Sequence, residues 1–373
     1  MKFRDLGAQY EALKIQIDEG IREVIESNSF ILGKQVTELE NELAKYVGRK
    51  YCIGVGNGTD ALVLSLMAMD IGKGDAVFTT DFTYFASASC ANSVGATPVF
   101  VDIDIDTFNI CPKSLEKAIE KVIKEGKLTP KAIIPVDLFG LPANFDEILK
   151  IAEKYDLIVL EDAAQGFGGQ IKDKKACSFG DISATSFFPA KPLGCYGDGG
   201  AIFTDDDKVD ERLRSLRALG KSPIDKYDNR EIGMNSRLDT IQAAILLPKF
   251  KAFVDYELND INKVANSYTQ RLKEKFKTPT IPEGYLSSWA QYTILCDDEE
   301  TRNNLQKKLK ENDIPSMIYY PRGMHEQAAF SYMNLTDDGF ENTIKATKRV
   351  LSLPIHPYLQ EEDIDKITDV LLK

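Results

Sequence analysis

Short apolar runs alternate with stretches of helical spacing between residues 50 and 205. The runs are rich in β-branched and aromatic residues, and such an alternation predicts crossover units around a mostly parallel sheet. The expected strands are Tyr51–Val55, Ala76–Thr80, Pro98–Asp102, Lys131–Asp137, Leu157–Glu161, Ser183–Phe187 and Gly200–Thr204. We therefore predict an α/β fold with functional groups at the carboxyl ends of strands and at helix N-termini.

Helical spacing of apolar residues also occurs on both sides of this region. Val36, Leu39, Leu43 and Val47 follow it upstream, which predicts a helix before the first strand. Two further helices are expected downstream, over residues 206–218 and 238–272, with a kink in the second near Pro248.

The last part of the chain predicts a smaller α+β unit. Strands are expected near residues 291–296 and 316–320, and helices near residues 299–312 and 361–372. We place the domain boundary within the long helix. The expected domains are a large one over residues 1–250, N-terminal helices included, and a small C-terminal α+β one over residues 251–373.

Composition narrows the classes of function. The chain of 373 residues is 43% hydrophobic and carries a net charge of -12, which disfavours general binding to nucleic acid or an anionic membrane. Six scattered cysteines without a Cys-x-x-Cys pair, and only two histidines, predict no disulfide framework and no metal site. No apolar run reaches the roughly 18 residues of a membrane span, and no apolar signal core follows Met1. We expect a cytoplasmic protein.

The most informative stretch surrounds Lys191. This lysine follows a buried strand, lies among residues that cannot solvate its ammonium group, and precedes the glycines of residues 194–200. Such surroundings keep an amine reactive near neutral pH, and the glycines let the backbone approach a ligand. Lys191 is therefore a candidate for a Schiff base, and a surface lysine in a turn is the alternative.

Two other strand ends carry groups that suit a cofactor. Asp162 ends an apolar run, where a carboxylate can hydrogen-bond a protonated pyridine nitrogen, or else cap a helix. The glycine-rich turn of residues 54–58 leads into a helix whose amides, with the Thr59 hydroxyl, can hold a phosphate. Its glycine spacing differs from the dinucleotide fingerprint, so a nicotinamide-dependent dehydrogenase is the competing interpretation.

With these motifs in order, the chain resembles the pyridoxal 5'-phosphate (PLP)-dependent nucleotide-sugar aminotransferases of the DegT family. The resemblance implies the fold-type I architecture of aspartate aminotransferase. It extends over nearly the whole chain, and is carried by residues 57–62, 101–104, 134–136, 161–165, 186–201, 235–239 and 320–321.

The resemblance assigns a role to each matching position. Lys191 is implied to hold PLP and to carry the proton in transamination, with pyridoxamine 5'-phosphate as the intermediate cofactor form, and Asp162 to contact the pyridine nitrogen. The other implied cofactor contacts are Gln165 at the ring hydroxyl, Tyr84 as the stacked ring, Gly58, Thr59 and Ser186 at the phosphate, and Asn235 from a neighbouring subunit. The last role implies a homodimer with shared active sites.

The sequence around Lys191 is most similar to UDP-2-acetamido-2-deoxy-3-oxo-glucuronate aminotransferases. This similarity implies that glutamate, converted to 2-oxoglutarate, aminates carbon 3 of a nucleotide-linked ketosugar for surface polysaccharides such as lipopolysaccharide O-antigen. The implied substrate contacts are Tyr320, Arg322, His325 and Arg230, with Lys221 and Lys226 as further sources of positive charge. His356 is expected to be structural.

Several alternatives stay open. The substrate could be a TDP-3-keto-6-deoxyhexose or a UDP-3-keto-N-acetylglucosamine, because three positions depart from the family pattern. Asp137 and Tyr319 stand where histidines are common, and Leu219 where a His-Gly pair is common. An inactive regulatory homologue is the alternative from another class, but such a protein is expected to have lost Lys191 or Asp162.

Overall fold

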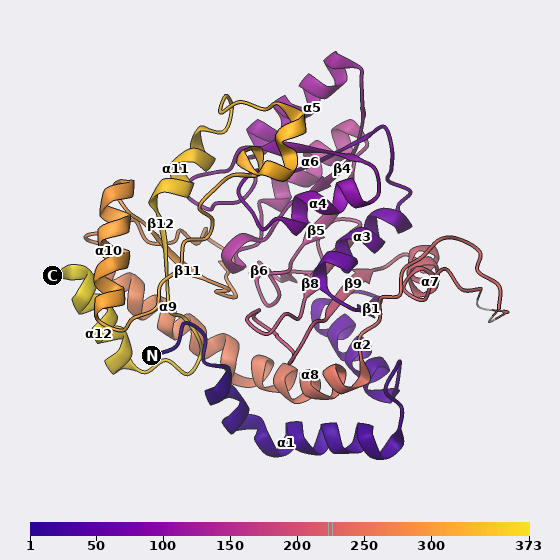
Figure 1. The fold of residues 1–373 in the computed structure, drawn as a ribbon, viewed down its shortest axis with the longest axis horizontal. Helices are drawn as coiled ribbons and strands as arrows, with labels where there is room; N and C mark the ends of the chain where they lie inside the picture. Colours follow the sequence, from indigo (N-terminus) through magenta and orange to yellow (C-terminus); the bar gives the residue numbers. More distant parts are fainter. Residues whose placement is uncertain (223, 226) are drawn as a thin grey trace.

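A seven-stranded sheet lies at the centre of the molecule, in the order β1-β9-β8-β5-β4-β2-β3 (Figure 1). The computed structural model describes residues 1–222, 224–225 and 227–373. Adjacent strands are parallel except at β9, which is antiparallel to both β1 and β8. The strands are β1 Tyr51–Val55, β2 Asp75–Thr80, β3 Thr97–Val101, β4 Thr129–Ile134, β5 Ile158–Asp162, β8 Ile182–Ser186 and β9 Gly200–Thr204. Each expected strand of this sheet overlaps an observed one, and the α/β class is confirmed.

Helices cover both faces of the sheet. They are α2 Lys34–Val47, α3 Gly58–Ala68, α4 Ala86–Ser93, α5 Pro112–Glu125, α6 Phe145–Tyr155, α7 Asp207–Leu216 and α8 Thr240–Ala252. Because strand side chains alternate between faces, Val77 and Leu160 pack with α3, α4 and α7, whereas Phe78 and Val159 pack with α5 and α6. Helices α2 and α8 cover the second face beside β9.

The N-terminal helix α1 (Leu6–Ser27) runs along α8 (Figure 1). Beyond α8 the helix continues through a π-helical turn, η2 (Phe253–Glu257), into α9 (Leu258–Leu272). The long helix is therefore confirmed, but its departure from α-helical geometry lies downstream of Pro248.

The C-terminal region has its own core around a two-stranded antiparallel sheet, β11 Tyr292–Leu295 and β12 Val350–Leu353. Its helices are α10 Glu299–Glu311, α11 Glu341–Arg349 and α12 Glu361–Leu372. The strand expected at 316–320 is wrong, because this segment makes only a single bridge, from Met317 to Ser352. Pro315 and Pro321 flank the segment and cannot donate to a strand ladder.

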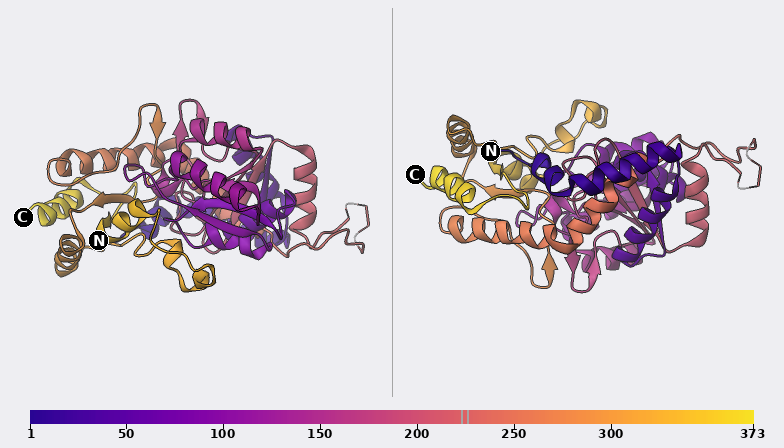
Figure 2. Two further views of the ribbon diagram at one scale, coloured as in Figure 1. Left: turned by 90° about the horizontal axis from the view of Figure 1, so that it is seen from above. Right: turned by 90° about the horizontal axis from the view of Figure 1, so that it is seen from below.

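Short elements complete the described chain. The small strands β6 Gln170–Ile171, β7 Lys174–Lys175 and β10 Tyr285–Leu286 form a second sheet, and the 3-10 turns are η1 Leu138–Gly140, η3 Met324–Glu326 and η4 Ala328–Met333. The N-terminus lies against the C-terminal region (Figures 1 and 2), where the Ile355 amide donates to the Phe3 carbonyl at 3.3 Å. None of the helices in the described part of the chain is long and apolar enough to cross a membrane.

The connection between α7 and α8 projects away from the rest of the molecule in both views of Figure 2. Two bridges, Lys221 to Asn229 and Ala218 to Asn235, join its outgoing and returning halves. This arm carries two of the residues for which the sequence predicts a ligand role, Arg230 and Asn235.

Candidate active site

Asp162 is the last residue of β5, at the carboxyl edge of the sheet, and its side chain is buried. Ser87 Oγ donates to Asp162 Oδ2 at 2.7 Å, and the Ala164 amide donates to Oδ1 at 3.1 Å. Burial raises the pKa of the Asp162 carboxyl, whereas these two donors and the charge of Lys191 act in the opposite direction. The carboxylate is thus fixed in place by donors and lies within electrostatic reach of a lysine.

Lys191 lies in the turn between β8 and β9. The turn is held by the Lys191 amide, which donates to the Phe188 carbonyl at 2.8 Å. Burial lowers the pKa of the Lys191 amine to about 8, with Asp162 opposing the shift. A larger fraction of this amine is therefore neutral and nucleophilic near neutral pH than in an ordinary lysine.

Gln165, Tyr320 and Tyr84 gather on the same edge. Gln165 is buried, accepts a hydrogen bond from the Phe139 amide at 2.8 Å and donates from Nε2 to Tyr320 Oη at 3.0 Å. The phenol of Tyr320 interacts electrostatically with Asp162 and Tyr84. The Tyr84 ring is 58% exposed, so its face is open to a ligand.

The turn after β1 forms a cradle at the N-terminus of α3. Asn57 caps this helix by accepting the Asp60 amide at 2.8 Å. A Cβ on Gly58 would lie 2.6 Å from Ser186 Cβ, so only glycine lets Ser186 approach the first turn. First-turn amides have no intrahelical acceptor and attract anions. The predicted phosphate contacts Gly58, Thr59 and Ser186 therefore lie together.

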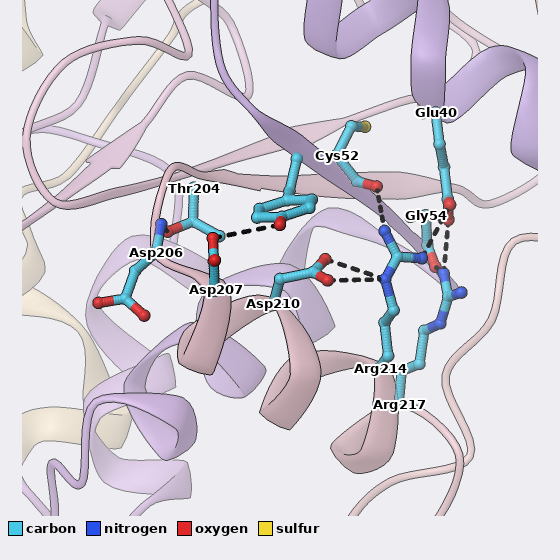
Figure 3. A network of polar contacts seen from close by, with 10 residues as sticks. Glu40, Cys52, Gly54, Thr204, Asp206, Asp207, Asp210, Arg214 and Arg217 are labelled. Carbon is cyan, nitrogen blue, oxygen red and sulfur yellow. Dashed lines mark hydrogen bonds and ion pairs between the residues drawn. The ribbon is translucent and has the colours of Figure 1, made fainter. Parts of the chain in front are cut away.

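A buried ion network holds this turn from behind (Figure 3). Arg217 Nη1 donates to Glu40 Oε1 at 2.6 Å and to the Gly54 carbonyl at 2.7 Å, while the Gly54 amide donates to Glu40 Oε1 at 2.8 Å. Arg214 Nη1 reaches the other Glu40 oxygen at 3.0 Å. Both polar groups of Gly54 are thus fixed by side chains from α2 and α7, which positions the start of the glycine-rich turn.

The predicted partner-subunit and charge residues lie elsewhere in the single chain. Asn235 and Arg230 are exposed on the projecting arm, and Asn235 Oδ1 accepts from the Arg237 guanidinium. Arg322 is exposed after the Tyr320-Pro321 pair, and Lys226 lies outside the described residues. Within the described part of the chain, no hydrogen bond or ion pair joins these exposed residues to Lys191, and their ligand roles stay predictions.

His325 is held by protein groups. Its Nδ1 lies 2.6 Å from Asp81 Oδ2, its amide donates to Asp81 Oδ1 at 2.8 Å, and its ring stacks on Phe340 at 4.5 Å between centroids. These contacts tie the segment after Tyr320 to the end of β2. The predicted contact of His325 with substrate is untested, and the observed contacts are structural.

Two residues near the site were missed at the level of sequence. Ser87, in the first turn of α4, donates a hydrogen bond to Asp162 at the end of β5. The sequence feature that could have indicated it is its position three residues after Tyr84. Arg4 interacts electrostatically with Lys191 although the two are far apart in the chain. No sequence-local pattern marks Arg4, because only the packing of the N-terminus on the C-terminal region brings it there.

A lysine of lowered pKa, a buried carboxylate at the end of a neighbouring strand, and a helix N-terminus on a mostly parallel sheet define a fold-type I PLP enzyme. The profile of the DegT/DnrJ/EryC1/StrS aminotransferase family matches residues 12–372. The chain belongs to this family, and the family resemblance seen in the sequence is confirmed.

Two curated relatives and one solved structure are similar over their whole length. UDP-2-acetamido-2-deoxy-3-oxo-D-glucuronate aminotransferase of Pseudomonas aeruginosa is 44% identical over 100% of this chain and 99% of its own. UDP-N-acetyl-3-dehydro-α-D-glucosamine 3-aminotransferase of Acidithiobacillus ferrooxidans is 39% identical over 98% of this chain and 96% of its own. A DegT DnrJ EryC1 StrS aminotransferase structure from Brucella abortus has a TM-score of 0.96 at 46% identity, over 100% and 98%.

A further structural relative carries the cofactor. NtdA of Bacillus subtilis, crystallised with bound pyridoxamine phosphate (PMP), has a TM-score of 0.87 at 29% identity, over 96% of this chain and 80% of its own. The described residues fit such a group. Lys191 supplies the amine, Asp162 an acceptor for a ring N–H, and the α3 cradle, which a Cβ on Gly58 would fill, the phosphate donors.

Proposed function

We propose that this chain uses PLP to transfer an amino group from glutamate to carbon 3 of a nucleotide-linked 3-ketosugar, yielding 2-oxoglutarate and an aminosugar. The observation that carries the proposal is the Lys191 amine, of pKa about 8, within electrostatic reach of the buried Asp162. The favoured acceptor is the UDP-2-acetamido-3-keto-hexuronate, because the Pseudomonas relative named for that substrate is 44% identical over the whole chain.

The cofactor, when bound, supplies an electron-withdrawing ring that stabilises negative charge on the carbon next to the transferred nitrogen. Lys191 Nζ is the group that holds the cofactor and then, once free, takes a proton from the donor's α carbon. Its lowered pKa suits both tasks, because an amine that is half neutral near pH 8 can accept and return a proton.

Asp162 keeps the ring nitrogen protonated by accepting its hydrogen bond. Ser87 and the Ala164 amide orient the carboxylate for this contact. Gln165, fixed between the Phe139 amide and Tyr320 Oη, presents its amide at the ring hydroxyl. Tyr84 covers one face of the ring, and Gly58, Thr59 and Ser186 hold the phosphate.

The site is completed, in this proposal, by a second copy of the chain. Asn235 and Arg230 are exposed on the connection between α7 and α8, which projects from the molecule (Figure 2). We infer a homodimer in which this arm reaches the active site of the partner subunit. Asn235 then binds the cofactor phosphate, and Arg230 binds the diphosphate of the nucleotide sugar. The cytoplasmic location, the two-domain division and a role in lipopolysaccharide biosynthesis stay predictions.

The test is an absorption spectrum of the purified protein loaded with PLP, followed by glutamate and then by each candidate ketosugar. We expect a cofactor band that glutamate bleaches and that the UDP-linked keto-hexuronate restores. Restoration by the TDP-ketodeoxyhexose or by UDP-3-keto-N-acetylglucosamine instead would reassign the substrate. No band at all would refute the proposal.

A borohydride reduction identifies the lysine. Lys249 is a matched internal control, because burial also lowers the pKa of its amine to about 8, yet its Nζ lies 4.6 Å from the Tyr196 ring centre. We expect peptide mapping to find the reduced cofactor on Lys191. The Lys191→Ala variant loses the label and the transfer, whereas Lys249→Met keeps both; a label on Lys249 would contradict the assignment.

A further inference from the structure

A cavity opens beside Lys191, between the first residues of the chain, the π turn η2 and the segment before α12. It has an empty volume of about 460 Å³, open mouth included. Arg4, Lys191, Glu257, Ser288 and His356 are among its lining residues. Ser288 also connects the cavity to the cofactor contacts, because its Oγ donates to the Gln165 carbonyl at 2.9 Å.

The guanidinium of Arg4 forms hydrogen bonds with the protein from only one of its nitrogen atoms. Its two hydrogen bonds within the described residues both start from Nη2, to the carbonyls of Trp289 at 3.2 Å and Ala290 at 2.9 Å. These bonds hold the side chain in place and leave Nε and Nη1 for another acceptor. A guanidinium presents its donors as a planar fork, which matches the two oxygens of a carboxylate.

No carboxylate of the described chain forms an ion pair with Arg4. Glu257, which interacts electrostatically with Arg4, already accepts hydrogen bonds from neutral donors, Gln9 Nε2 at 2.9 and 3.0 Å and Tyr358 Oη at 2.7 Å. Burial lowers the pKa of Arg4 to about 10, with Glu257 opposing the shift. A charge kept in a partly buried position without a contact anion favours an anionic ligand.

His356 provides a second, independent observation. Its ring is 6% exposed and lines the same cavity, and Nδ1 has no hydrogen-bond partner among the described residues. Burial and the charge of Arg4 lower the pKa of His356 to about 4, so the ring is neutral at physiological pH. The unpaired Nδ1 has almost no accessible surface, and His356 contributes a neutral ring beside Arg4 that adds no like charge to the cavity.

We propose that Arg4, together with His356, forms a carboxylate-binding subsite that orients a substrate against Lys191. This inference rests on the proposed function, and it names the part of the substrate that the cavity takes. Asp5 and Glu257 also line the cavity and balance the charges of Arg4 and Lys191, so the cavity has no excess positive charge. That balance suits a single carboxylate and disfavours a diphosphate.

Two substrates of the proposed reaction carry such a group. One is glutamate, which has an α- and a γ-carboxylate, and the other is a keto-hexuronate, which has a carboxylate at carbon 6. Both react at the same cofactor position, so one subsite beside Lys191 is able to serve either. The experiment therefore tests binding of the amino donor and binding of the sugar substrate separately.

The variants are Arg4→Gln, which can still donate to the Trp289 carbonyl but lacks the charge, and Arg4→Lys, which keeps it. Arg22→Gln is the matched control, because Arg22 is exposed on α1 and away from the cavity. Calorimetry of the PLP-loaded enzyme with glutarate, a dicarboxylate that cannot transaminate, reports binding without turnover. We expect glutarate to bind about 10- to 100-fold more weakly to Arg4→Gln, with Arg4→Lys in between, since a hydrogen bond to a charged group contributes about 1.5–3 kcal/mol.

These two tests compare the KM of glutamate with the KM values of the keto-hexuronate and of UDP-3-keto-N-acetylglucosamine, whose sugar has no carboxylate. A rise for glutamate alone assigns the donor carboxylate, and a rise for the hexuronate over the uncharged sugar assigns the sugar carboxylate. Unchanged glutarate binding with unchanged KM values overturns the subsite, as do equal losses in Arg4→Gln and Arg4→Lys. A wild-type protein that binds glutarate through Arg4 but transfers no amine would refute the proposed function and leave the subsite intact.

Discussion

Two fully buried carboxyl groups, Asp137 and Glu161, lie directly behind Asp162. Asp137 Oδ1 accepts a hydrogen bond from the Ala143 amide at 3.0 Å. No donor among the described residues reaches Oδ2. Burial and the nearby Glu161 charge raise the pKa of Asp137 well above its usual value. Burial also raises the pKa of Glu161, but this carboxylate receives three opposing hydrogen bonds, from the Cys177 amide, the Phe179 amide and Ser183 Oγ. We therefore expect Asp137 to be a neutral acid that donates its proton to Glu161.

The Asp137→Asn substitution tests this protonation state. Asparagine keeps the Oδ1 acceptor and replaces the acid hydroxyl with an N–H donor of similar size. In the wild type, the folded pKa lies above the unfolded value near 4, so the stabilising effect of the acid form is complete below pH 4 and is lost as the pH rises through the folded pKa. Within that window each pH unit costs the wild type about 1.4 kcal/mol, a loss that the asparagine variant does not share.

Urea unfolding of the wild type and Asp137→Asn at pH 5, 6, 7 and 8 measures the difference. We expect the free energy of unfolding of Asp137→Asn, measured relative to that of the wild type, to increase as the pH rises. Asp173→Asn is the control, because Asp173 is exposed in the turn between β6 and β7. Asp137→Leu leaves the Ala143 amide unpaired and is expected to cost about 1–3 kcal/mol at every pH. Parallel pH profiles for the wild type and Asp137→Asn would refute a protonated Asp137.

Three further substitutions test the support of the site. Ser87→Ala removes the 2.7 Å hydrogen bond to the buried carboxylate of β5, and we expect kcat to fall about tenfold in steady-state assays with little change in melting temperature. Glu40→Gln leaves Arg217 buried without its counter-charge, and urea unfolding is expected to show a loss of about 3 kcal/mol. Gly58→Ala places a Cβ 2.6 Å from a serine side chain, so the variant is expected to release PLP on dialysis, whereas Gly72→Ala, where a Cβ meets its nearest atom at 3.6 Å, retains it.

The central sheet was predictable because its strands are buried on both faces and therefore appear as continuous apolar runs. Helix α1 was not named as a helix from its pattern. Leu13, Ile17 and Val24 keep a helical spacing and are buried, but the exposed Ile15 and Ile25 obscure this narrow stripe in the sequence. The segment around Met317 makes a single bridge and not the predicted strand for a related reason, because a short apolar run does not reveal whether its neighbours can pair.

The parts of the site that sequence predicts are those carried by local motifs. Asp162 ends β5 and Lys191 lies in the turn that follows β8, and because these neighbouring strands are parallel, both residues come to the same edge of the sheet. Ser87, Arg4 and His356 come from helices or loops far away in the chain, and their proximity depends on packing that no single segment encodes.

The charges around the cofactor position explain why a third acid can lie behind Asp162. Asp162 interacts electrostatically with Lys191, whereas Glu161 is held by hydrogen-bond donors and has no cation among the groups that act on its pKa. A third ionised carboxylate at Asp137 would add like charge in a region of low dielectric, and that cost exceeds the cost of holding one proton. A protonated Asp137 acts as a donor to Glu161, which a histidine at this position can also be. The resemblance implies a histidine at this position, and a protonated Asp137 would supply the same donor to Glu161 without adding a charge beside Asp162.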